Sequence, residues 1–194
     1  MPVTKTRTAP AERLLDTAAT LFDREGIRAV GIDRLIAEAD VARASLYQHF
    51  GSKDALVVAY LERADRNDRA GYAHAVRHLA AQPLERVRAF FSLAEAGARR
   101  RGYRGCLYIN AATEFPQAEH PANQVVTAHR TWQLDELAAA LAQAGLADPP
   151  ELAARIQLVY DGGLVGTKTA HTVEPIRRAA ALADGLVAAA APAG

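Results

Sequence analysis

The chain has few features that would cross-link a protein or attach it to a membrane. It contains a single cysteine, Cys106, so no internal disulfide can form. A lone cysteine favours a reducing compartment and excludes a disulfide-stabilised scaffold. Residues 1–12 are polar and lack the apolar segment of a secretory signal, and no apolar run approaches the ~18 residues that a membrane span needs. We therefore expect a cytoplasmic protein that does not bind a membrane.

Excess charge of one sign and enzyme signatures are also missing. Lysine plus arginine number 23 and aspartate plus glutamate 22, so the net charge of +1 does not indicate nucleic-acid binding, which would have to depend on local geometry. The sequence has no phosphate loop and no Gly-x-Ser-x-Gly, His-Glu-x-x-His or Cys-x-x-Cys motif. His74 and His78 have a spacing that can share a metal, but no third ligand lies near them. We expect no enzyme activity, metal or cofactor.

The sequence is instead rich in residues that form helices. Hydrophobic residues make up 50% of the chain, which suffices for a core and excludes a disordered protein. Alanine is abundant, and no hairpin signal or alternating β-branched run is present. We predict an all-α fold of about nine helices. Their expected ranges are 9–25, 32–39, 43–49, 53–81, 84–99, 106–115, 121–145, 148–170 and 175–190. We expect an N-terminal domain at 1–55 and a C-terminal domain at 56–194.

Two local features of these helices lead to further expectations. Thr8 can cap the first helix, because its hydroxyl can accept a bond from a free backbone N–H. The second half of the helix over 53–81 is polar and charged, notably from Arg63 to Arg69. We expect part of that half to face solvent.

The first sixty residues predict a helix-turn-helix. The predicted helices over 9–25, 32–39 and 43–49 are too short to bury much alone, but they suit a unit in which one helix supports another in the DNA major groove. In the shortest helix, Leu46 and Phe50 lie four residues apart and can pack on Leu35 and Val41. The side chains expected to point outward are Arg43, Ser45, Gln48 and His49, which can donate hydrogen bonds to bases and phosphates.

Residues 31–56 resemble the DNA-binding segment of the TetR family of transcriptional regulators, most specifically in the string Leu-Tyr-x-His-Phe-x-Ser-Lys-x-x-Leu that begins at Leu46. The resemblance implies that Tyr47 and Lys53 contact DNA phosphates. It also implies a palindromic DNA operator, a homodimer and a small-molecule effector that releases a repressor. Two positions depart from the family pattern: Asp40 replaces a turn glycine, and Ala42 replaces a capping serine or threonine.

A second string, Gly-Cys-Leu-x-x-Asn-x-x-x-Glu from Gly105, is similar to one found in part of the same family. Cys106, Asn110 and Glu114 fall on one side of a helix because they are four residues apart. We expect these three residues to line an effector pocket, with Phe90 and Trp132 as apolar walls. The alternative is a merely structural role, with Cys106 as a small buried hydrophobe and Asn110 as a cap.

Two apolar stripes near the C-terminus predict a four-helix dimer interface. The residues expected in it are Leu152, Ile156, Val159 and Gly163 on one helix and Ile176, Leu182, Leu186 and Val187 on the next. Alternatively, these stripes fill the core of the chain itself. Two other functions also remain open: a small thiol-dependent enzyme that uses Cys106 with His129 or His171, and a helical interaction module whose DNA-binding head has lost its function.

Overall fold

The computed structural model describes residues 9–100 and 102–190, and this part of the chain folds into helices joined by short loops, with no strand. The nine helices of the described residues are α1 (Pro10–Glu25), α2 (Ile32–Glu38), α3 (Arg43–Phe50), α4 (Lys53–Val76), α5 (Pro83–Ala98), α6 (Leu107–Glu114), α7 (Pro121–Gln143), α8 (Pro149–Ala170) and α9 (Glu174–Ala190). The all-α prediction is confirmed. The largest difference in bounds is at α4, which ends at Val76, before Pro83 begins α5. The predicted cap Thr8 lies outside the described residues.

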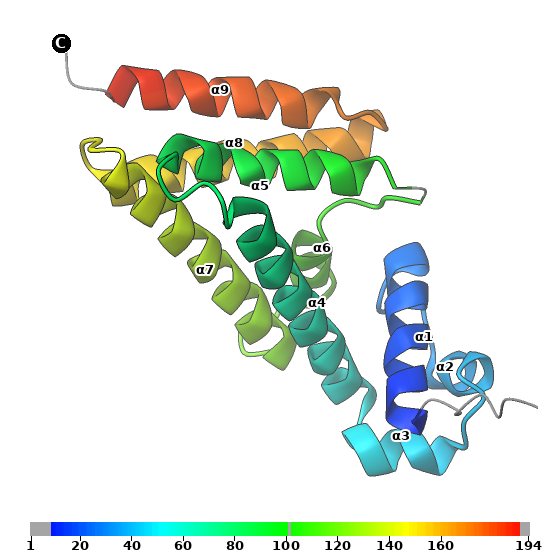
Figure 1. Ribbon diagram of the computed structural model, residues 1–194. Helices are drawn as coiled ribbons and strands as arrows, with labels where there is room; N and C mark the ends of the chain where they lie inside the picture. The colour runs from blue at the N-terminus through cyan, green and yellow to red at the C-terminus, as the bar shows by residue number, and fades with distance from the viewer. Residues whose placement is uncertain (1–8, 101, 191–194) are drawn as a thin grey trace, which may run out of the picture.

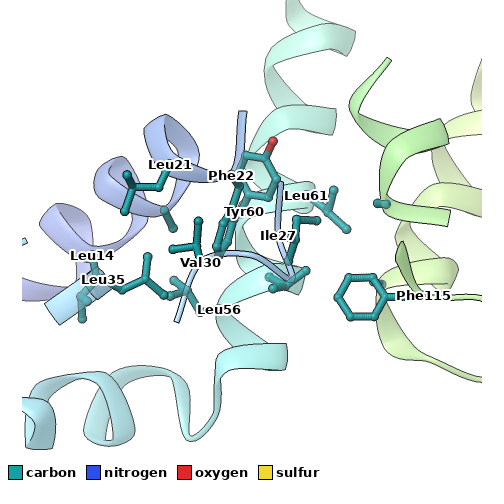
Figure 2. Close-up of a cluster of buried hydrophobic side chains, with 14 of the residues drawn as sticks. Leu14, Leu21, Phe22, Ile27, Val30, Leu35, Leu56, Tyr60, Leu61 and Phe115 are labelled. Atoms are coloured by element: carbon teal, nitrogen blue, oxygen red, sulfur yellow. The ribbon is translucent and has the colours of Figure 1, made fainter. Parts of the chain in front are cut away.

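The first three helices form a head around a hydrophobic core. Leu14, Leu21 and Leu35 are fully buried there, and Leu56 joins them from the start of α4 (Figure 2). Leu46 of α3 is fully buried in the same cluster. Each fully buried leucine contributes roughly 1.5–3 kcal/mol relative to an exposed one. The predicted packing of the short third helix on the second is therefore observed.

The turn between α2 and α3 forms without the family's glycine. Asp40 adopts the left-handed conformation with a φ of 49°, which aspartate tolerates better than most residues. The guanidinium of Arg13 stabilises the turn from α1, because it donates to the carbonyl oxygens of Ala39 at 3.0 Å and Asp40 at 2.9 Å. Ala42 precedes α3 without a side-chain cap, as its lack of a hydroxyl predicts.

The remaining helices form a second body, in which α8 and α9 lie side by side at the end farthest from α3 (Figure 1). Helices α4 and α7 run from this end towards the head, and α6 lies between them and α1. The core of the head continues into this second body, since Ala111 and Phe115 of α6 belong to the same buried cluster as Leu56 and Leu61 of α4. The expected boundary at residue 55 falls within α4, which belongs to both bodies.

The structure corrects most of the predicted dimer interface. Leu152, Ile156, Gly163 and Ile176 are buried inside the single chain, where α8 packs on α9. A Cβ atom on Gly163 would lie 2.6 Å from the Cβ of Ala179, so this glycine serves the contact of the two helices within one chain. The other predicted members, Val159, Leu186 and Val187, are half-buried against the same core, and only Leu182 is exposed, at 62%. Helical periodicity finds a buried stripe but cannot say which helix covers it.

Three large apolar side chains are instead exposed on these two helices. Leu158 and Val165 of α8 are 72% and 46% exposed, and Leu182 of α9 is the third. Leu158, Gly162 and Val165 follow one another at helical spacing, and Gly162 has open space around it. This outer face of α8 and α9 has no cover within the described part of the chain.

Candidate DNA-reading helix and ligand cavity

The short helix α3 presents polar side chains to solvent. Arg43, Gln48 and His49 are exposed, Ser45 is half-buried, and Tyr47 is 46% exposed with its ring outside the core. Leu46 holds the helix in place from the opposite side. Arg43 forms an ion pair with Asp33 of α2, so its guanidinium is already oriented at the start of α3. Of the four residues predicted to point outward, Arg43, Gln48 and His49 are therefore accessible and Ser45 is partly covered.

The start of α4 is capped, and its lysine bonds to the protein itself. The Ser52 hydroxyl accepts a bond from the backbone N–H of Ala55 at 3.0 Å. The ammonium of Lys53 donates to the carbonyl oxygen of Ile27 at 2.7 Å and lies 6.0 Å from the ring centre of Phe22. Burial lowers the pKa of Lys53. In this conformation the ammonium ties α4 to the loop after α1, and contact with a phosphate requires that bond to break.

A cavity of about 540 Å³ lies between the end of α1 and helices α4 to α8. Its volume is in the range typical of small-molecule sites. All five residues proposed for the pocket from the sequence are in its wall: Phe90, Cys106, Asn110, Glu114 and Trp132. Phe22, Asp23 and Ile27 also line it, so the cavity directly adjoins the DNA-binding head.

Aromatic rings form one side of the cavity. Tyr72 of α4 stacks on Phe90 of α5 with 4.2 Å between ring centres, and Trp132 of α7 meets both rings edge-on at 5.6 and 5.8 Å. Tyr160 of α8 lies 6.5 Å from Phe90 in the same arrangement. Edge-to-face and offset contacts of this kind stabilise aromatic clusters beyond the area that they bury.

A polar cluster that the sequence analysis missed lies beside these rings. The Tyr108 hydroxyl donates to Oδ2 of Asp68 at 2.8 Å, and the Tyr108 ring stacks on His129 with 3.6 Å between centres. Asp65 bonds Nδ1 of His129 at 2.8 Å. Burial raises the pKa of Asp68 and lowers that of His129. The expectation that part of the second half of α4 faces solvent holds for Arg66, Asn67 and Asp68, which are exposed, although Asp68 also lines the cavity. Asp65 is half-buried against His129. The spacing of Asp65 and Asp68 with Tyr72 nearby could have suggested that these residues share one side of the helix.

Asn110 and Glu114 already have partners from the protein. Asn110 donates to the carbonyl oxygen of Arg104 at 3.0 Å, and its oxygen accepts from the ammonium of Lys168 at 2.8 Å. The carboxylate of Glu114 accepts the backbone N–H groups of Ile27 at 3.1 Å and Arg28 at 2.6 Å. Helix α6 is therefore joined to α8 at one end and to the head at the other.

Cys106 lies just before α6, half-buried in the cavity wall. Burial raises the pKa of its thiol, although the backbone N–H groups of Ile109 and Tyr108 and the charge of Arg130 oppose the shift. A reactive thiol needs a lowered pKa, and here desolvation outweighs the nearby positive charge.

Iodoacetamide should therefore alkylate Cys106 in the folded protein at least about tenfold more slowly than it alkylates glutathione at pH 8, since less thiolate is present. The rate can be followed by mass spectrometry. The same chain in guanidinium is the control and should react at the ordinary rate. A folded-state rate equal to that of glutathione would show that the thiolate is stabilised after all.

Neither a metal site nor a membrane segment emerges from the described residues. No group of three histidine, cysteine or acidic side chains there could hold a metal ion, and no helix there is long and apolar enough to cross a bilayer. His74 is exposed and bonds Arg77, and His78 is exposed one turn later.

An exposed recognition helix on a helix-turn-helix head, joined to a helical body with a cavity, is typical of DNA-binding proteins that carry a second, ligand-binding domain. Two family models match the two parts: "Bacterial regulatory proteins, tetR family" at residues 14–60 and "Tetracyclin repressor-like, C-terminal domain" at residues 83–183. The chain belongs to the TetR family, and it is a DNA-binding transcriptional regulator.

Individual proteins agree with this assignment. The chain is similar to SCO4454, a TetR-family transcriptional regulator from Streptomyces coelicolor, with 37% identity and a TM-score of 0.85 over 93% of this chain and 96% of that one. Reduced NemR from E. coli, 22% identical with a TM-score of 0.81 over 91% and 95% of the two chains, shares the fold. The transcriptional regulator AcuR from Cereibacter sphaeroides is 33% identical over 92 residues, which span 47% of this chain and 42% of AcuR.

Proposed function

We propose that this regulator is a repressor that binds a palindromic operator as a homodimer and is released by a small molecule bound in the cavity. The single observation that carries the release mechanism is the position of Glu114, which lines the cavity and also accepts two backbone N–H groups of the head. A ligand that displaces α6 would pull on that contact. It can shift the balance between binding and released states only by its difference in affinity for the two.

The residues proposed to contact DNA are Arg43, Ser45, Tyr47, Gln48, His49 and Lys53. Arg43 and Gln48 are assigned to base edges, because both are exposed at the accessible face of α3 and can form paired hydrogen bonds. Tyr47 and Lys53 are assigned to phosphates. Two copies of α3 would enter major-groove faces about one helical turn, or a multiple of it, apart.

The homodimer is proposed to form through the exposed outer face of α8 and α9. Leu158, Val165 and Leu182 offer the apolar surface, and the open space at Gly162 allows a partner helix to approach closely. Exposed apolar side chains that gather on one face are typical of protein interfaces. This face replaces the stripe that periodicity alone suggested.

A gel shift with DNA upstream of the regulator's own gene tests operator binding directly. The wild-type protein should bind tightly, with salt sensitivity and resistance to competitor DNA. Arg43→Ala or Gln48→Ala should relax the preference at particular base positions, at a cost of about 1–3 kcal/mol for each lost base contact. Binding that is equally strong to unrelated DNA would contradict the proposal.

Lys53→Ala distinguishes a phosphate contact from a purely structural lysine. We expect weaker binding to all sequences and a salt dependence whose slope falls by about one unit. Thermal unfolding of the same variant reports the loss of the bond to Ile27 separately. If stability falls and the salt slope is unchanged, Lys53 only ties α4 to the head.

A further inference from the structure

The cavity combines aromatic rings with a carboxylate that forms no ion pair with any of the described residues. Asp68 and Tyr72 lie one turn apart on α4, and both are in the cavity wall together with Phe90, Trp132 and Tyr160. Oδ2 of Asp68 accepts the hydroxyl of Tyr108, while Oδ1 accepts no hydrogen bond from the part of the chain that the structure describes. The acid sits among rings and keeps one oxygen available to the cavity.

The charged groups near Asp68 do not neutralise it. Asp65 is occupied by Arg69 and by His129, and burial favours the neutral form of that histidine. The charge of Arg100 reaches Asp68 only through space, since the two form no ion pair within the described residues and Arg100 is exposed at the end of α5. Asp68 is exposed to the cavity and has only the neutral Tyr108 hydroxyl as a hydrogen-bond donor among the described residues. A bound cation would add a charge-assisted hydrogen bond, which is stronger than a neutral one.

A tyrosine hydroxyl in the cavity wall has no hydrogen-bond partner among the described residues. The Tyr103 hydroxyl is buried and forms no hydrogen bond within the described residues. Native proteins rarely leave a buried polar atom unpaired, and such an atom in a cavity wall is explained by a ligand or water that pairs with it. Tyr103 therefore offers a hydrogen bond to a polar atom of the occupant.

We propose that the cavity binds an organic cation, whose ammonium group lies against Asp68 and the faces of the aromatic cluster. Aromatic rings attract cations through the negative potential of their faces, most strongly where water is excluded. The cavity is large enough for a ligand of ordinary small-molecule size. The aromatic or aliphatic part of such a ligand can fill the remaining space against Leu93 and Leu164. This inference rests on the proposed function only in treating the cavity as the effector site.

An anionic occupant is the competing possibility, because Arg100 and Arg104 also line the cavity. Arg104 lies near an acidic residue, because it and Glu114 both approach Gly26. A Cβ atom built on Gly26 would lie 3.5 Å from Nη1 of Arg104 and 3.2 Å from Oε1 of Glu114. Neither arginine belongs to the aromatic cluster. The observations thus favour positive charge at the aromatic side.

Calorimetry on the full-length protein with three probes of similar shape tests the charge preference. The probes are benzyltrimethylammonium, benzyl alcohol and phenylacetate. We expect the ammonium probe to bind at least about tenfold more tightly than the other two. Tighter binding of phenylacetate, with its loss in Arg100→Gln, would overturn the proposal, as would the absence of binding by the ammonium probe up to millimolar concentration.

The variant Asp68→Asn assigns the preference to one residue. The amide keeps an oxygen that can accept the Tyr108 hydroxyl, so the variant should fold, which circular dichroism can verify. Affinity for benzyltrimethylammonium should fall at least about tenfold, and affinity for benzyl alcohol should not change. Glu62→Gln, which removes an exposed charge elsewhere on α4, is the matched control and should bind like the wild type. Equal ammonium affinity in Asp68→Asn and wild type would refute the role of Asp68.

A second variant tests the same site in case Asp68→Asn does not fold. Phe90→Leu keeps an apolar wall but removes one ring face, and it should also weaken the ammonium probe selectively. A gel shift with and without the probe is recorded separately. Asp68-dependent binding without DNA release would support the cation site and contradict the release mechanism, so the two proposals fail independently.

Discussion

Replacing Leu158 and Leu182 with arginine should convert the regulator into a folded monomer that binds its operator at least about 100-fold more weakly. Both side chains are largely exposed, at 72% and 62%, so the arginines have room and the core should remain intact. Burying them against a partner would leave unpaired charges in an apolar interface. A monomer reads only one half-site, and linking two binding units commonly raises affinity by factors of about 10²–10⁴. Light scattering, circular dichroism and a gel shift check the three expectations.

A matched control adds the same charges elsewhere. Ala70 and Ala73 of α4 are exposed and lie on neither α8 nor α9, so the double arginine variant there should stay dimeric and bind DNA like the wild type. If Leu158→Arg with Leu182→Arg remains a dimer that binds the operator normally, the outer face of α8 and α9 is not the interface. The earlier stripe gives a poor test, because any side chain at Gly163 collides with Ala179 inside the chain.

Glu114→Ala should loosen the connection between α6 and the DNA-binding head. The variant leaves the N–H groups of Ile27 and Arg28 without their carboxylate, and charge-assisted bonds of this kind are stronger than neutral ones. We expect a loss of about 1–2 kcal/mol in the free energy of unfolding, because water can reach Arg28 but only partly reaches Ile27. For a chain of this size the Tm should fall by about 3–6 °C.

Amide hydrogen exchange gives the local readout of this variant. The N–H groups of Ile27 and Arg28 should exchange at least about tenfold faster, while amides within the core of α8 should not change. Glu119→Ala removes an exposed acid in the loop after α6 and is the control. Unaltered exchange at both positions in Glu114→Ala would show that the carboxylate does not restrain the head.

The cavity wall shows what helical spacing in the sequence can predict about a binding site and what it cannot. The i, i+4, i+8 spacing placed Cys106, Asn110 and Glu114 on one side of α6, and all three do line the cavity with Phe90 and Trp132. The hydrogen bonds that each side chain forms there depend on residues far away in the sequence. Glu114 binds backbone groups 86 and 87 positions earlier in the chain, and Asn110 binds Lys168 58 positions later. Contacts over such separations have no signature in a local string.

Helix positions, the head and its turn were determined by the sequence itself. Breakers, caps and the 3.6-residue period act within a few positions, so the nine helices, the burial of Leu46 and the left-handed turn at Asp40 could be predicted. Tertiary structure alone decided which buried stripe faces which neighbour. It placed Ile156 and Ile176 in the chain's own core, left Leu158 uncovered, turned Asp65 and Asp68 towards α6 and α7, and raised the pKa of Cys106. The physical reason is that burial, desolvation and partner choice depend on elements far apart in the sequence, whereas helix formation depends on adjacent residues.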